Sequence, residues 1–124
     1  MRTISRQELV DWLDSDEWDG VLIDVLPEES FRDVHAAGAI NVPLGDEFER
    51  RVRQAAPDKV RNVVLYCGSS QCPASQEAAL KMEEMGYSRV FVFKGGLDEW
   101  QRAGLPLEGE KVEAPAFSPP GFDI

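Results

Sequence analysis

The chain has 124 residues, of which 43% are hydrophobic and 29% charged, a composition typical of a single globular domain with its own core. Its net charge of -10 argues against binding to nucleic acid or to an anionic membrane, because both require a cationic surface. No apolar run approaches the ~20 residues of a bilayer span, and the first residues lack the apolar core of a secretory signal. We therefore expect a cytoplasmic protein.

The first half of the chain predicts helices and strands in alternation. Ser5 and Glu8 have the spacing of a capping box, so we expect a helix over residues 6–16. The run Val21-Leu22-Ile23 predicts a buried strand that ends at Asp24. The next expected elements are a short helix from Pro27 through Arg32, a short strand within residues 38–43 and a helix over residues 46–55.

The second half continues the alternation. Strands are expected over residues 62–66 and 90–93, with a helix between them that begins near Pro73 and ends near Met85. Gly95-Gly96 breaks the chain before a last helix. Alternating strands and helices predict an α/β domain over residues 1–108, with a central, mostly parallel sheet and helices on both faces. Residues 109–124 are expected to form an extended C-terminal tail.

Both cysteines of the chain lie in the stretch YCGSSQCPAS, residues 66–75. Cys67 directly follows a predicted strand, and ligands of parallel sheets bind beyond the carboxyl ends of the strands. The small polar loop that follows allows backbone N–H groups to form an anion-binding nest, which would lower the pKa of the thiol. These residues therefore favour a cysteine nucleophile, and a buried core thiol is the alternative interpretation.

Over residues 3–108 the chain resembles the single-domain rhodaneses, a family of sulfurtransferases. Three pieces carry the resemblance in order: TISRQELVDWL, VLIDVLPEESFRDVHAAGAINVPL and NVVLYCGSSQCPASQEAALKMEEMGYSRVFVFKGGLDEWQRAGLPL. The resemblance implies a rhodanese-like α/β fold and a persulfide that forms on Cys67. It further implies partners that are a small sulfur donor and a thiol or protein acceptor, with no cofactor. The persulfide would be held by the loop amides of Gly68, Ser69, Ser70, Gln71 and Cys72.

The sequence departs from the family where many active rhodaneses carry arginine. Those positions are Gly68 and Cys72 in the loop and Leu26, two positions after Asp24. Thiosulfate is a dianion, so the missing guanidinium groups remove charge-assisted contacts. We therefore expect weak thiosulfate activity.

Cys72 within the loop and two residues outside it, Asp24 and His35, are further candidates. Cys72 is either a spacer at the helix start or a thiol that resolves an oxidised Cys67. A metal site is the least favoured use of Cys72, because His35 is the only histidine of the chain. Asp24 and His35 are interpreted as structural residues that support the site.

Other functions remain as alternatives. One is a non-catalytic rhodanese-like binding module, which the missing arginines favour. Another is a thiol redox protein that uses Cys67 and Cys72. A phosphatase of the cell-cycle type shares this fold but needs arginine six positions after its cysteine. Position 73 is proline, so we exclude phosphatase chemistry.

Overall fold

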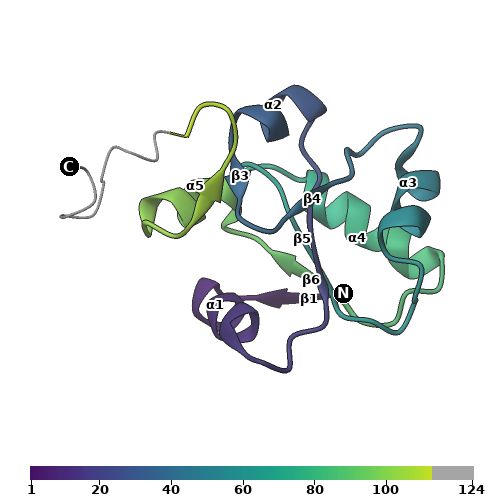
Figure 1. Ribbon diagram of the computed structural model, residues 1–124. Helices are drawn as coiled ribbons and strands as arrows, with labels where there is room; N and C mark the ends of the chain where they lie inside the picture. The colour runs from purple at the N-terminus through teal and green to yellow at the C-terminus, as the bar shows by residue number, and fades with distance from the viewer. Residues whose placement is uncertain (113–124) are drawn as a thin grey trace, which may run out of the picture.

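The computed structural model describes residues 1–112, in which strands and helices alternate along the chain (Figure 1). The strands are β1 (Arg2–Ile4), β2 (Val21–Asp24), β3 (His35–Ala36), β4 (Ile40–Asn41), β5 (Val63–Tyr66), β6 (Val90–Phe93) and β7 (Leu107–Glu108). The helices are α1 (Arg6–Asp14), α2 (Glu28–Asp33), α3 (Phe48–Ala55), α4 (Ala74–Glu84) and α5 (Gly96–Arg102). Within residues 1–112, no helix has both the length and the apolar character that crossing a bilayer requires.

Five strands form one parallel sheet in the order β1-β6-β5-β2-β4. β5 lies in the middle, where Leu65 pairs with Ile23 of β2 and with Val92 of β6. All residues of β2, β5 and β6 are buried, as expected for strands covered on both faces. The predicted α/β fold is therefore confirmed. Cys67 directly follows β5, so it lies at the carboxyl edge of the sheet, beside its central strand.

Each face of the sheet has its own apolar core, because successive side chains of a strand point to opposite faces. Val63 and Leu65 pack with residues of α3 and α4, whereas Val64 and Tyr66 pack with residues of α1 and α5. Figure 1 shows these two pairs of helices on opposite sides of the sheet. Cys67 continues the alternation, and its side chain belongs to the core beneath α3 and α4.

The start of α1 follows the sequence prediction. The Ser5 hydroxyl accepts from Glu8 N at 3.1 Å, and the Glu8 carboxylate accepts from Ser5 N at 2.9 Å, which completes the capping box. α1 ends at Asp14 rather than at residue 16, and α3 begins at Phe48 rather than at Asp46. Such differences are usual where helix ends fray.

Short strands that the sequence analysis does not predict close the domain. β1 pairs with β6 at one edge of the main sheet, and β3 pairs antiparallel with β7 through His35 and Glu108. Beyond β7, Glu110 N donates to Arg32 O at 2.9 Å, so the chain stays against the end of α2. The rest of the predicted C-terminal tail, residues 113–124, lies outside the described residues.

Candidate functional site

The loop between β5 and α4, residues 67–73, contains both cysteines. Cys67 is 1% exposed, whereas Cys72 at the other end of the loop is partly exposed. Both thiols are free, and no disulfide joins them. The nucleophile predicted from sequence therefore lies below the surface, and the second cysteine is the more exposed of the two.

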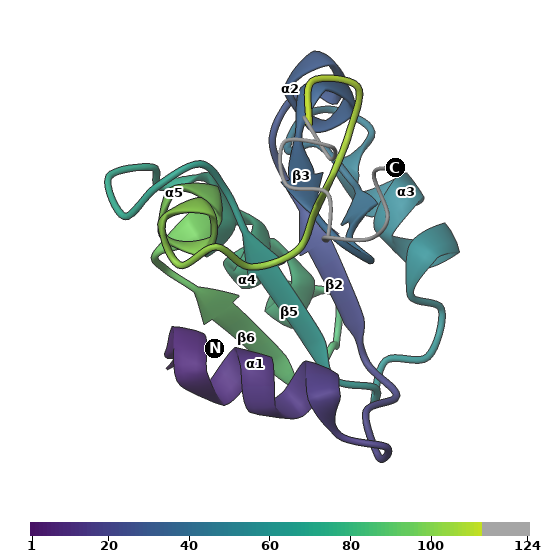
Figure 2. The same ribbon diagram turned by 60° about the vertical axis from the view of Figure 1, so that its left-hand side comes forward.

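The start of α5 holds the main chain of this loop. Leu97 N donates to Cys67 O and Asp98 N donates to Gly68 O, each at 2.8 Å. Figure 2 shows the loop after β5 running beside α5. In a trans peptide the N–H points opposite to the C=O, so the Gly68 and Ser69 amides point away from these two donors. The start of the loop is thus held in place by a neighbouring helix.

Close approach of the two segments requires glycine at position 96. Gly96 has φ +66, a left-handed conformation that favours glycine. A Cβ there would lie 2.6 Å from Cys67 O and 2.9 Å from Ser69 N. The second glycine of the pair seen in the sequence as a chain break therefore lies against the backbone of the cysteine loop.

The Cys67 thiol lies between two oxygen atoms. Its Sγ is 3.3 Å from the Cys72 carbonyl oxygen and 3.6 Å from Ser75 Oγ. Burial raises the pKa of the Cys67 thiol, and its interaction with the Cys72 side chain raises the pKa further, although Ser75 opposes the shift. A hydrogen bond to the Cys72 carbonyl needs the S–H proton, so this contact favours the neutral thiol. The sequence prediction of a lowered Cys67 pKa is therefore wrong for this loop conformation.

Cys72 has the environment that the sequence analysis assigned to Cys67. Burial alone would raise the pKa of the Cys72 thiol. Hydrogen bonds from the Cys67 side chain and from the backbone of Ala74 and Gly68 outweigh burial and hold the Cys72 pKa below its usual value. The anion-stabilising amides of this conformation thus face the second cysteine.

The remaining loop amides are partly engaged within the loop. Cys72 N donates to Ser69 O at 3.1 Å, and Gln71 N donates to Ser69 Oγ at 3.2 Å. Ser70 and Gln71 expose their side chains. A persulfide held by the amides of residues 68–72 remains a proposal, because two of these amides would first have to exchange partners.

Asp24 and Leu26 lie beside the loop at the end of β2. The Asp24 carboxylate accepts from Leu26 N at 2.8 Å, and burial raises its pKa although this bond opposes the shift. A Cβ at position 68 would lie 3.8 Å from Leu26 Cδ2, so an apolar side chain borders the loop here. Asp24 therefore shapes the turn after β2, and its amide partner belongs to that turn and not to the cysteine loop.

His35 lies in β3 and links α2 to β7. Its Nδ1 is 2.6 Å from Phe31 O, its ring stacks on Phe31 with centroids 3.6 Å apart, and its Nε2 is 3.4 Å from Glu108. These contacts connect two segments of the fold and involve no residue of the cysteine loop. The geometry is that of a structural histidine.

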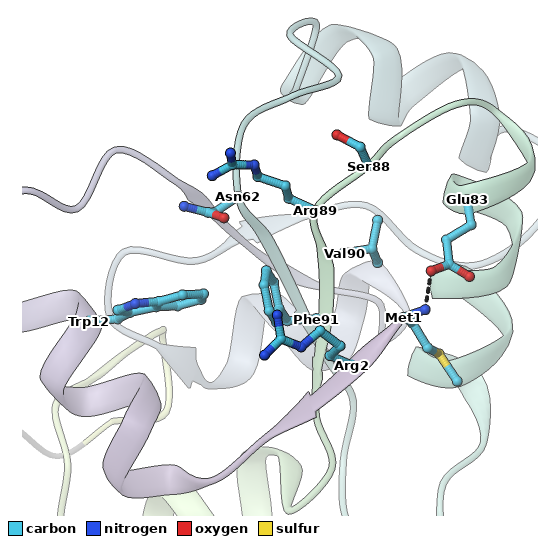
Figure 3. A pocket seen from close by; sticks show the side chains of 9 residues that line it. All are labelled: Met1, Arg2, Trp12, Asn62, Glu83, Ser88, Arg89, Val90 and Phe91. Atoms are coloured by element: carbon cyan, nitrogen blue, oxygen red, sulfur yellow. Dashed lines mark hydrogen bonds and ion pairs between the residues drawn. The ribbon is translucent and has the colours of Figure 1, made fainter.

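A separate cavity of about 350 Å³ lies at the amino ends of β5 and β6, far from the cysteine loop (Figure 3). Its wall includes Phe91, over which the Arg2 guanidinium lies at 5.6 Å, and Trp12, which contacts Phe91 edge to face. No cysteine or histidine lines this cavity. Among the described residues, no cluster of three or more His, Cys, Asp or Glu side chains could hold a metal ion.

The structure adds residues that the sequence analysis did not select. Ser75 contacts the Cys67 sulfur, and Leu97 and Asp98 hold the loop through their amides. A polar residue in the first turn of the helix that follows the cysteine loop is a signal for Ser75. The α5 amides leave no such signal, because any residue type can supply a backbone N–H.

The site described above is a cysteine loop at the carboxyl end of the central strand of a parallel α/β sheet. The sequence profile of the rhodanese-like domain matches residues 5–103, and the chain belongs to the rhodanese-like family. Among solved structures, the rhodanese-like domain of the Alr3790 protein from Anabaena superimposes with a TM-score of 0.79 at 23% identity, covering 100% of this chain and 89% of that one.

Two proteins with similar sequences carry names that describe different functions. The HTH-type transcriptional regulator Rv0324 of Mycobacterium tuberculosis is 33% identical over 87 residues, which cover 70% of this chain and 37% of that protein. The thiosulfate sulfurtransferase PspE of Escherichia coli is 40% identical over 68 residues, which cover 55% of this chain and 62% of that protein. The chain thus spans less than two thirds of either relative.

Proposed function

We propose that this chain is a sulfurtransferase or sulfur carrier that forms a persulfide on Cys67. The observation that carries the proposal is the position of Cys67, at the carboxyl end of the central strand in a loop held by α5. Membership in the rhodanese-like family and the sulfurtransferase name of one relative support it. The donor would be a small sulfane-sulfur compound such as thiosulfate, and the acceptor a thiol of a small molecule or protein.

The chemistry consists of two displacements at sulfur. The Cys67 thiolate attacks the outer sulfur of thiosulfate, the sulfur–sulfur bond of the donor breaks, and sulfite leaves with the electron pair. An acceptor thiolate then attacks the outer sulfur of the persulfide, and the Cys67 thiolate leaves. Backbone N–H groups of the loop would stabilise the negative charge on the transferred sulfur without reorganisation of solvent.

Intact-protein mass spectrometry after exposure to thiosulfate tests this function. We expect the wild type and Cys72→Ser to gain the mass of one sulfur atom, which a reducing thiol then removes, and Cys67→Ser to gain none. A pure binding module would hold the anion without a covalent mass gain. Sulfur uptake by Cys67→Ser, or no uptake by the wild type with any of several sulfur donors, would contradict the proposal.

Cys72 is suited to protect Cys67 from oxidation, because the two cysteine side chains interact and hydrogen bonds hold the pKa of the Cys72 thiol below its usual value despite partial burial. Peroxide converts the Cys67 thiolate to a sulfenic acid. The Cys72 thiolate would attack that sulfur, form the disulfide and expel hydroxide, which leaves as water once protonated. On a persulfidated Cys67 the same attack would expel hydrosulfide.

We expect peroxide to produce a Cys67–Cys72 disulfide in the wild type, and irreversible oxidation of Cys67 in Cys72→Ser. Non-reducing peptide mapping after a peroxide series measures both products. Equal accumulation of the sulfonic acid at Cys67 in the two proteins would show that Cys72 is only a spacer at the start of α4.

A further inference from the structure

Ser75 is a buried polar side chain in contact with the candidate nucleophile. It is 2% exposed, lies in the first turn of α4, and places its Oγ 3.6 Å from Cys67 Sγ. Within residues 1–112, this is the hydrogen bond that its side chain makes. Burying a hydroxyl is unfavourable unless it is hydrogen-bonded. The contact with the Cys67 sulfur supplies that hydrogen bond for Ser75.

The two oxygen atoms beside Cys67 differ in what they can do. The Cys72 carbonyl can only accept, so it holds the protonated thiol and faces an anionic sulfur unfavourably. The Ser75 hydroxyl can accept or donate, because its hydrogen rotates. When Cys67 loses its proton, only the hydroxyl can reverse its role and donate to the sulfur.

The electrostatics of the site agree with a stabilising role for the hydroxyl. Burial and the Cys72 side chain raise the pKa of Cys67, whereas the Ser75 side chain lowers it. The Ser75 backbone N–H also lowers the Cys67 pKa, so both polar groups of this residue favour the thiolate. Hydrogen bonds to an ionised acceptor are stronger than bonds between neutral groups.

We propose that the Ser75 hydroxyl is the side-chain donor that stabilises the thiolate of Cys67. This inference rests on the proposed function, in which the Cys67 thiolate takes part in both displacement steps. It is the nucleophile that takes sulfur from the donor, and it is the leaving group when the acceptor takes the sulfur away. A better-stabilised thiolate is more abundant at neutral pH and leaves faster in the second displacement.

The test is the pH dependence of Cys67 alkylation in a Cys72→Ser background, where Cys67 is the only thiol. We expect Ser75→Ala to shift the midpoint upward by about one pH unit, so that alkylation below the midpoint slows about tenfold. Ser75→Thr retains the hydroxyl and should keep a midpoint close to that of the parent. Ser69→Ala removes a hydroxyl that accepts a hydrogen bond from Gln71 N, and it should leave the midpoint of Cys67 alkylation unchanged.

Thermal unfolding of each variant establishes that it is folded before its midpoint is compared. An unchanged midpoint in folded Ser75→Ala would overturn the proposal. An equal upward shift of the midpoint in Ser75→Thr would also overturn it, because the effect would then come from packing. An equal shift in Ser69→Ala would overturn it as well, because the effect would then come from a loosened loop. Alkylation uses no sulfur donor, so failure of the sulfur-uptake experiment leaves this result interpretable.

Discussion

Replacing Gly96 with alanine is expected to destabilise the protein by about 2 to 5 kcal/mol and to move the cysteine loop, with loss of sulfur uptake on Cys67. The left-handed conformation of Gly96 alone accounts for about 1 to 2 kcal/mol of this loss. The larger part arises because the new Cβ would meet backbone atoms at 2.6 and 2.9 Å, and backbone cannot move aside as a flexible side chain can.

Gly104 supplies the matched control at the other end of α5. Its φ of +73 is as unfavourable for alanine as that of Gly96, but a Cβ there would have nothing within 4 Å. We therefore expect Gly104→Ala to lose only about 1 to 2 kcal/mol and to retain sulfur uptake. Chemical denaturation and intact mass spectrometry measure both variants. Equal stability losses in the two would contradict the close contact between α5 and the loop.

Replacing Cys72 with arginine is expected to raise kcat/KM for thiosulfate roughly tenfold to hundredfold. Residues 67–75 contain no Lys or Arg, and Leu26 borders the loop on the β2 side. Cys72 is partly exposed, so a longer side chain at this position can direct its guanidinium toward the loop opening. A guanidinium would supply the charge-assisted contact with the dianion that the natural loop lacks.

Two variants separate the position of the new charge from other effects. Gln71→Arg places a cation on an exposed neighbouring position, and Cys72→Ser removes the thiol without adding charge. We expect a smaller gain from Gln71→Arg and none from Cys72→Ser. A folded Cys72→Arg protein with unchanged thiosulfate turnover would show that the missing charge does not limit the reaction.

The elements that the sequence predicts are those with a strong local pattern. β2, β5 and β6 are buried apolar runs, and the capping box at Ser5 marks the start of α1. β1 has only Ile4 buried, and β3 and β7 have two residues each, so their existence depends on tertiary pairing that no local pattern reveals.

The candidate site, like the fold, is only partly predictable from local sequence patterns. The position of Cys67 after a buried strand follows from sequence pattern and parallel-sheet geometry. Which groups face its sulfur depends on the orientation of each loop peptide, and α5 sets that orientation from far along the chain. The Cys72 carbonyl lies at the Cys67 thiol, where only amides were expected from the sequence.

The main-chain bonds from α5 anchor the loop without using its exposed side chains. The carbonyls of Cys67 and Gly68 are held by backbone amides, and the exposed side chains of Ser70 and Gln71 take no part in that anchoring. Exchanging these two side chains is therefore expected to leave the main chain around Cys67 in place. Under the proposed function, substitutions at these two surface positions would change which sulfur acceptors react and leave the chemistry at Cys67 unchanged.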